Sequence, residues 1–250
     1  MGVAGGPDMI ENGLVLSLDA SDKNSYVSGS TRWFDLSGNN NSGSLVNGPT
    51  FNTGSGGNIV FDGVDDYVNC GNNSTLSFTQ GGGVDVPFSI NLWVYPTSYG
   101  LGASQYSILI GKSQFISGWT REFSTSITST AVGFTLFVND FNYIGINGTT
   151  PLSLNTWSNV CFTYDGSKTL SGLKLYINSN PQTTTTISAG TYTGMANTGI
   201  NVNIGRQNNT GGDSGYLRGN IANTVIYRNK TLTPSEILQN YNATKARFGL

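Results

Sequence analysis

The run Phe88-Ser-Ile-Asn-Leu-Trp-Val-Tyr95 is the stretch that decides the fold class of this 250-residue chain. Every second residue in it is apolar, namely Phe88, Ile90, Leu92 and Val94. A period of two places these four side chains on one face of a β-strand. Pro96 follows directly, and proline ends most strands because it cannot donate a ladder hydrogen bond. The run therefore predicts a strand with one apolar face.

Similar short runs extend from this strand in both directions. Most are rich in β-branched or aromatic residues and are separated by Gly, Asn, Asp and Ser, which favour turns. The runs are 14–18, 32–36, 57–61, 67–70, 74–78, 106–110, 121–127, 133–139, 143–146, 157–164, 173–178, 201–205 and 219–227. Turn residues at 62–66 predict a hairpin between two of them, 57–61 and 67–70. The regular spacing predicts an all-β, two-sheet antiparallel sandwich.

One helix is expected, near the C-terminus. In the segment Leu232-Thr233-Pro234-Ser235-Glu236, Thr233 can cap the helix, Pro234 suits its first turn, and Glu236 completes a capping box. Apolar residues on one side of the following turns predict a short helix that packs on the sandwich.

The composition excludes several classes of function. Only 10% of the residues are charged, the net charge is −2, and 34 residues are glycine. No basic stripe is present, so a nucleic-acid partner is not expected. No run approaches the length of a membrane span. The opening residues lack the pattern of a signal peptide, so we expect synthesis in a cytoplasm. We expect an N-terminal arm at 1–11 and one domain at 12–250.

The catalytic groups of common enzymes are missing. The chain has no histidine, which removes the usual triads and most zinc sites. A glycoside hydrolase needs two carboxylates across the sugar bond. The three glutamates, Glu11, Glu122 and Glu236, form no such pair in the sequence. We therefore predict no catalytic residues, and glycoside hydrolysis is the least favoured function.

Two kinds of binding site remain open. Exposed aromatic and amide side chains can bind sugars, and the loop candidates are Tyr99, Tyr106, Trp119, Asn142 and Tyr143. Asp62, Asp65 and Asp66 are three oxygen donors that could take part in a calcium site. The alternative for the aspartates is that they shape a turn through local hydrogen bonds, and this alternative is favoured. No other cofactor is expected.

The order of several segments resembles a known family. These segments include FDGVDDYV at 61–68, FSINLWVYPT at 88–97, TWSNVCFTYDG at 156–166 and YLRGNIANTVIY at 216–227. Together they resemble the laminin-G-like and pentraxin-like jelly rolls of the concanavalin A-like group. The blocks GLVLSLDASDKNSY near the start and KARFGL at the end resemble structural proteins of tailed, particularly marine, phages.

The resemblance implies several further expectations. In such jelly rolls the first strand, 14–18, lies beside the last, 221–227. Pentraxins join two strands by a disulfide, but here Asn91 stands opposite Cys161, so Cys161 and Cys70 are expected to be unbonded. The paired calcium ions of pentraxins are not carried over.

The functional expectation is a non-enzymatic virion protein, located in a capsid decoration or a tail and able to contact host glycans. Its expected partners are other virion proteins or further copies of itself, held through the arm, where Pro7, Met9 and Ile10 can dock, and through a sheet edge. The alternative is a carbohydrate-binding module of a secreted or cell-surface protein.

Overall fold

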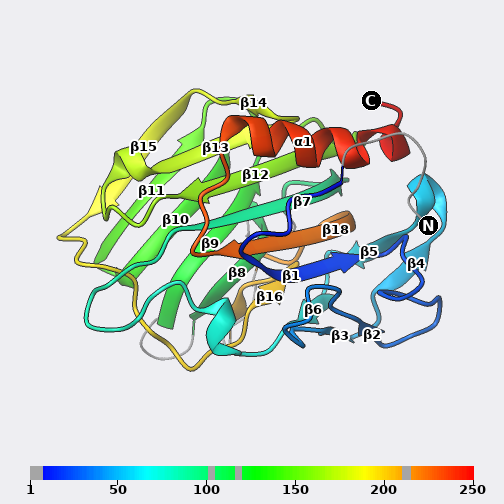
Figure 1. Cartoon of the computed structure of the whole chain (residues 1–250), viewed down its shortest axis with the longest axis horizontal. Helices are drawn as coiled ribbons and strands as arrows, with labels where there is room; N and C mark the ends of the chain where they lie inside the picture. Colours follow the sequence, from blue (N-terminus) through cyan, green and yellow to red (C-terminus); the bar gives the residue numbers. More distant parts are fainter. Residues whose placement is uncertain (1–7, 101–104, 116–119, 210–214) are drawn as a thin grey trace.

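The computed structural model describes residues 8–100, 105–115, 120–209 and 215–250, and it shows two β-sheets packed face to face (Figure 1). The first sheet has eight strands, in the order β14-β13-β12-β7-β18-β5-β4, with β1 also paired to β18. The second has ten, in the order β15-β11-β10-β9-β8-β16-β6-β3-β2, with β17 paired to β8. All pairs are antiparallel except β17 with β8. The predicted all-β sandwich is confirmed.

The eight-stranded sheet consists of β1 (Leu14–Asp19), β4 (Thr50–Asn52), β5 (Asn58–Asp62), β7 (Phe88–Pro96), β12 (Ser158–Tyr164), β13 (Leu173–Ile177), β14 (Asn180–Pro181) and β18 (Arg218–Arg228). The ten-stranded sheet consists of β2 (Arg32–Trp33), β3 (Gly43–Val46), β6 (Tyr67–Asn69), β8 (Tyr106–Phe115), β9 (Thr120–Thr128), β10 (Val132–Asn139), β11 (Asn142–Gly148), β15 (Thr184–Ala189), β16 (Asn203–Ile204) and β17 (Asn208–Asn209). Helical segments are η1 (Gly54–Gly56), η2 (Ser74–Leu76), η3 (Leu170–Gly172), α1 (Pro234–Thr244) and η4 (Lys245–Phe248). No helix among the described residues has the length and apolar character needed to cross a membrane.

Aromatic rings from both sheets meet in the core between them. Phe88 of β7 stacks on Phe78 with ring centroids 4.0 Å apart and meets Phe134 of β10 edge to face at 5.8 Å. Phe134 in turn lies 5.2 Å from Phe162 of β12. Such rings bury large apolar areas, so these contacts join the two layers.

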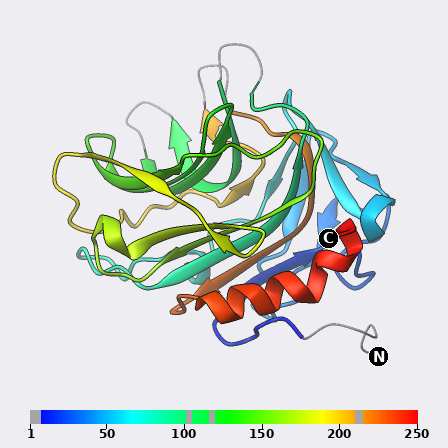
Figure 2. The same cartoon turned by 90° about the horizontal axis from the view of Figure 1, so that it is seen from above.

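The outer face of β7 is also buried, because the C-terminal helix covers it (Figure 2). Trp93 points to this side and stacks on Phe248 at 4.0 Å and on Tyr241 at 5.7 Å. Its indole N–H donates to the Thr244 hydroxyl at 2.8 Å. Trp157 precedes β12 and packs against Phe248 at 4.8 Å. Both tryptophans serve packing, in a second layer under the helix.

The two ends of the fold close on each other. β1 pairs with β18 in the register Leu16↔Ile226 and Leu18↔Thr224, which confirms the predicted neighbours. The helix begins at Pro234 with the predicted capping box, since the Thr233 side chain accepts from the Glu236 N–H. Lys230 pairs with Glu236 at 2.6 Å and ties the helix to the end of β18.

The predicted hairpin between 57–61 and 67–70 is wrong. β5 belongs to the eight-stranded sheet and β6 to the ten-stranded sheet, so residues 62–66 cross from one layer to the other. Phe61 and Val68 still face the same core, each from its own sheet. Turn residues indicate a reversal of the chain, but they do not distinguish a hairpin within one sheet from a connection between two.

Residues 8–11 pack on the chain itself. The Ile10 N–H donates to Asn240 Oδ1 at 2.9 Å, and the Tyr227 hydroxyl donates to the Ile10 carbonyl at 3.0 Å. Met9 and Ile10 pack on a small apolar cluster between β18 and α1. These two side chains are therefore partly covered by the chain itself, Pro7 lies outside the described residues, and docking of the arm on a partner stays a prediction. Cys70 and Cys161 are both free, as predicted, and Cys161 pairs in register with Asn91.

Candidate functional site

The outer face of the ten-stranded sheet carries small and polar side chains. One row runs across the strands in register through Ser44, Asn69, Asn203, Gly111, Ser124, Thr135 and Gly145. Because side chains alternate along each strand, this row lies opposite the apolar core. The sheet therefore presents an uncharged polar floor, with larger groups at one end of the strands.

The turn between β10 and β11 forms that end. Asn139 Oδ1 accepts from the Phe141 N–H and from Asn142 Nδ2, both at 2.9 Å. Asn142 Oδ1 accepts from the Thr191 N–H at 2.8 Å, so this amide is committed to the turn. Phe141 itself is 81% exposed at the tip. The amides thus hold an aromatic ring out in solvent.

Aromatic and charged side chains lie close to this turn on β9, β10 and β11. Tyr143 is half-buried and lies 5.8 Å from Phe137, which stands beside it in register. The Arg121 guanidinium lies over the Phe137 ring at 5.0 Å and pairs with Asp140 at 3.9 Å. Burial lowers the pKa of Arg121 to about 10, and the nearby Asp140 carboxylate opposes that shift. We call this group (Arg121, Phe137, Asp140, Phe141 and Tyr143) the turn site.

The structure separates the predicted sugar-binding residues. Asn142 and Tyr143 lie at the β10–β11 turn, whereas Tyr106 pairs with Thr128 at the opposite end of the strands. The Tyr106 hydroxyl donates to Gln207 Oε1 at 3.3 Å. Tyr99 donates to the Leu152 carbonyl, and its ring packs on the core. Trp119 lies outside the described residues. The five candidates therefore do not form one site.

Phe141 was not predicted, although it belongs to the same loop. Its signal is the segment Asn139-Asp-Phe-Asn142, in which one aromatic residue stands between three turn-forming residues. An aromatic residue with no apolar neighbour in a turn has no core face to join, so exposure could have been inferred.

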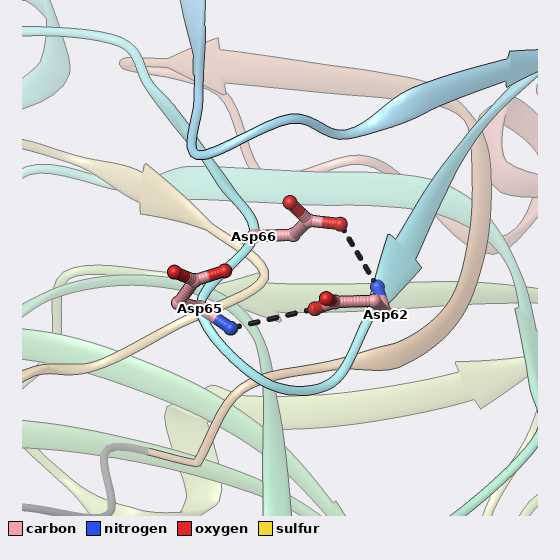
Figure 3. Close-up of side chains that lie close together, drawn as sticks. All are labelled: Asp62, Asp65 and Asp66. Atoms are coloured by element: carbon pink, nitrogen blue, oxygen red, sulfur yellow. Dashed lines mark hydrogen bonds between the residues drawn. The ribbon is translucent and has the colours of Figure 1, made fainter.

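The three aspartates lie at the crossing between β5 and β6, and their carboxylate oxygens are within 4.8 Å of one another (Figure 3). Asp62 Oδ1 accepts from the Val64 N–H at 2.7 Å, and Asp66 Oδ2 accepts from the Asp62 N–H at 3.0 Å. Burial, followed by the charges of Asp62 and Asp65, raises the pKa of Asp66. The remaining oxygens suit a hard cation such as calcium. The two hydrogen bonds show that the carboxylates also shape the crossing, as the favoured alternative predicted.

Glu122 is buried in an ion pair. Its carboxylate lies 2.9 Å from Lys112 Nζ and accepts from the Ser77 hydroxyl and from the Thr198 N–H, the latter at 2.7 Å. Lys112 pairs with Phe123 and Ser113 with Arg121, which leaves Glu122 as the extra residue of a β-bulge. The side chain of a bulge residue can point to the same face of the sheet as the side chain of its neighbour.

The arrangement of Ser77, Lys112 and Glu122 is unsuited to nucleophilic catalysis. A lysine acts as a general base only when neutral, and here it directly contacts a carboxylate. The residues instead join η2 to β8, β9 and the segment at Thr198.

Comparisons with known proteins agree with this fold. A sequence profile described as the concanavalin A-like lectin/glucanases superfamily, of the laminin-G type, matches residues 61–238. The chain belongs to this superfamily. No curated protein matches the sequence.

Among solved structures, the binding domain of Paraclostridial Mosquitocidal Protein 1 superposes with a TM-score of 0.68 at 17% identity, over 93% of this chain and 52% of that one. A botulinum neurotoxin type C structure, described by its interaction with two ganglioside molecules, gives 0.68 at 18% identity, over 94% and 52%. The binding domain of botulinum neurotoxin DC in complex with rat synaptotagmin II gives 0.67 at 19%, over 94% and 52%. The chain thus spans about half the length of these proteins. At such identities the likeness shows the fold alone.

Proposed function

We propose that this chain is a non-enzymatic glycan-binding protein of a virus particle, and that the turn site contacts the sugar. The observation that carries the proposal is the position of Phe141, a residue that is 81% exposed. Exposing a phenylalanine forgoes the apolar burial that stabilises a fold, so the turn holds this ring out at a cost. An exposed ring can stack on the apolar face of a sugar.

The neighbours of Phe141 supply the polar half of such a site. Arg121 and Asp140 can donate to and accept from hydroxyl groups, and the Tyr143 hydroxyl can do both. Sugar sites typically combine a few polar groups of this kind with aromatic surface. Two similar structures, one described by an interaction with gangliosides and one in complex with rat synaptotagmin II, support a recognition role.

The arrangement of carboxylates supports a non-enzymatic role. Glu122 is fixed by Lys112, and Glu236 is fixed by Lys230 and the helix cap. The three clustered aspartates lie on a tight crossing between sheets. Hydrolysis needs an acid and a nucleophile or base on two sides of the bond, and none of these groups offers that geometry.

The particle setting rests on the surface of the molecule and on the phage resemblance. A surface with few charges suits a repeated, closely packed coat. β15 pairs only with β11 among the described strands, so its other edge is available to another chain. Its sequence Thr184–Ala189 holds no charged residue or proline that would discourage pairing. We propose this edge as the contact with other virion proteins or with a second copy.

Glycan binding is tested with a glycan array probed by the wild-type protein and by Phe141→Ala. We expect specific sugar signals for the wild type and a loss of about tenfold or more in the variant, because burying a phenylalanine side chain contributes about 1.5–3 kcal/mol. Phe34→Ala is the matched control, since Phe34 is also exposed but lies beside β2. A wild type that binds no sugar, or equal losses in both variants, would contradict the site.

The particle setting is tested separately by cryo-electron microscopy of purified particles from the source culture. We expect density that fits the sandwich at a symmetry-related set of positions, with β15 facing a neighbour. Density that fits nowhere on the particle, while the protein is found free in the medium, would favour a secreted carbohydrate-binding module.

A further inference from the structure

The loop between β3 and β4 contains the pair Asn47-Gly48, which lies against the crossing at 62–66. Both residues are exposed. Asn47 Nδ2 donates to the Asp65 carbonyl at 3.0 Å, so its side-chain amide contacts the crossing directly. Among the described residues, the one atom within 4 Å of a Cβ placed on Gly48, apart from its chain neighbours, is Asp66 Oδ1 at 3.9 Å. The pair therefore lies beside the carboxylates shown in Figure 3.

An asparagine that is followed by glycine can modify itself. The backbone nitrogen of the glycine attacks the side-chain carbonyl carbon of the asparagine, a cyclic imide forms, and ammonia leaves. Water then opens the ring and leaves a carboxylate, as aspartate or as isoaspartate. The net reaction converts an amide and water into a carboxylate and ammonium, so it needs no oxidant and no further reactant. Glycine favours the attack because it has no side chain to obstruct it.

The chain contains three such pairs, at 12–13, 47–48 and 147–148, and the structure favours the second. The pair at 147–148 lies in β11, where both residues pair in register with β15, and Gly148 is buried. Gly13 is half-buried, and its carbonyl accepts from the Arg228 N–H. Gly48 is exposed, and its N–H donates to no group in the part of the chain that the structure describes. Its nitrogen is therefore the most accessible of the three.

The attacking nitrogen must lose its proton, and a carboxylate is placed to accept it. Asp66 Oδ2 accepts from the Asp62 N–H at 3.0 Å, whereas Oδ1 is the atom that lies toward Gly48. A positioned carboxylate of this kind acts as a general base. We propose that Asn47-Gly48 is a self-modifying site, at which the Gly48 nitrogen attacks the Asn47 side chain while Asp66 takes up the proton and returns it to the departing amide nitrogen.

The hydrogen bond from Asn47 to the Asp65 carbonyl slows this reaction without preventing it. An exposed hydrogen bond of this kind changes a rate by a factor of about ten at most. The product has no amide donor, so the bond is lost and a carboxylate faces the carbonyl in its place. A fourth negative charge then lies beside the three aspartates. The modification thus loosens the connection between the two sheets as molecules age, and it involves neither a sugar nor the turn site.

The test follows the full chain during incubation in mildly alkaline water that carries heavy oxygen, with digestion afterwards in ordinary water. Peptide mapping by mass spectrometry then locates each carboxylate that formed during the incubation. We expect the label at residue 47 before residue 12, and at least about tenfold faster than at residue 147, whose strand must open first. Earlier labelling of residue 12 or 147 overturns the inference. So does an unlabelled residue 47 under conditions that label a synthetic peptide of residues 43–52.

The variant Asp66→Asn tests the general base. Loss of the base slows the labelling of residue 47 by about tenfold or more. A purely structural role of Asp66 predicts the opposite, because a loosened crossing would expose the pair further. Asp65→Asn is the matched control, since it removes an exposed carboxylate of the same cluster and keeps the backbone carbonyl that Asn47 contacts. Its rate should equal that of the wild type. An unchanged or faster rate in Asp66→Asn overturns the proposal.

Discussion

Trp93 shows how one residue can anchor a whole layer. Its ring lies between β7 and the C-terminal segment, with Phe248 and Tyr241 stacked on it and Thr244 bonded to its N–H. We predict that Trp93→Ala lowers the free energy of unfolding by about 3–5 kcal/mol, as for other buried aromatic truncations. Trp93→Phe should cost less, because it keeps the stacking. Urea unfolding followed by circular dichroism measures both, and equal costs would show that stacking is unimportant.

Asp66 gives a prediction about pH. Burial and the neighbouring aspartates raise its pKa above the ordinary 3.8, so the folded state holds its proton more strongly than the unfolded state does. Stability from this group is therefore complete below pH 3.8 and is lost as the pH rises through the raised pKa. In the Asp66→Asn variant, the measured melting temperature should change less with pH across that window than it does in the wild type.

The same titration distinguishes a turn from a calcium site. A bound calcium ion would favour the charged carboxylates, so calcium chloride would raise the melting temperature above the window in the wild type and not in Asp65→Asn. If calcium has no effect, the three carboxylates serve the crossing between the sheets alone.

For single residues, the sequence predicts which side chains could bind a ligand better than it predicts where those side chains lie in the fold. Three aspartates in five residues were correctly seen as neighbours, because a tight turn brings them together whatever the sheets do. Tyr106 and Tyr143 could not be separated in advance, since their distance depends on the register of β8 to β11. Phe141 was not predicted, although its place between turn-forming residues indicates exposure.

Among the elements, β8 and β9 depend on a buried charge pair. Lys112→Met would leave Glu122 buried without its cation, and we predict a loss of about 3–5 kcal/mol. The double variant Lys112→Met/Glu122→Leu should regain most of that loss, because no charge then remains buried. Chemical unfolding of the two variants decides the matter. A single variant as stable as the wild type would mean that water reaches the carboxylate.

Predictability also differs between elements. The strand at Phe88–Pro96 and the helix at Pro234–Thr244 followed from alternation and capping, which are local properties. The placement of β5 and β6 in different sheets did not follow from the sequence, because whether a turn joins strands of one sheet or of two is decided by packing against distant strands such as β18 and β16.

For the whole molecule, the two cysteines report on separate regions. Burial raises the pKa of each thiol to about 12, so neither should react with a thiol reagent at pH 8 while folded. Cys161 belongs to the small cluster under α1, whereas Cys70 belongs to the main core. We predict that Cys161 is labelled first in mild denaturant, because small clusters open locally at lower cost. Mass spectrometry after timed labelling measures the order, and earlier labelling of Cys70 would contradict it.

The closure of β1 on β18 has a consequence for how the molecule can be mounted. Residue 8, the helix and Phe248 all lie on the side of the eight-stranded sheet, away from the ten-stranded one (Figure 2). If the molecule were attached to a larger assembly near residue 8 or near the helix, its polar floor would face away from that assembly. Copies attached side by side in this way would form a layer of outward-facing sugar contacts, in which many weak contacts combine into strong binding through avidity.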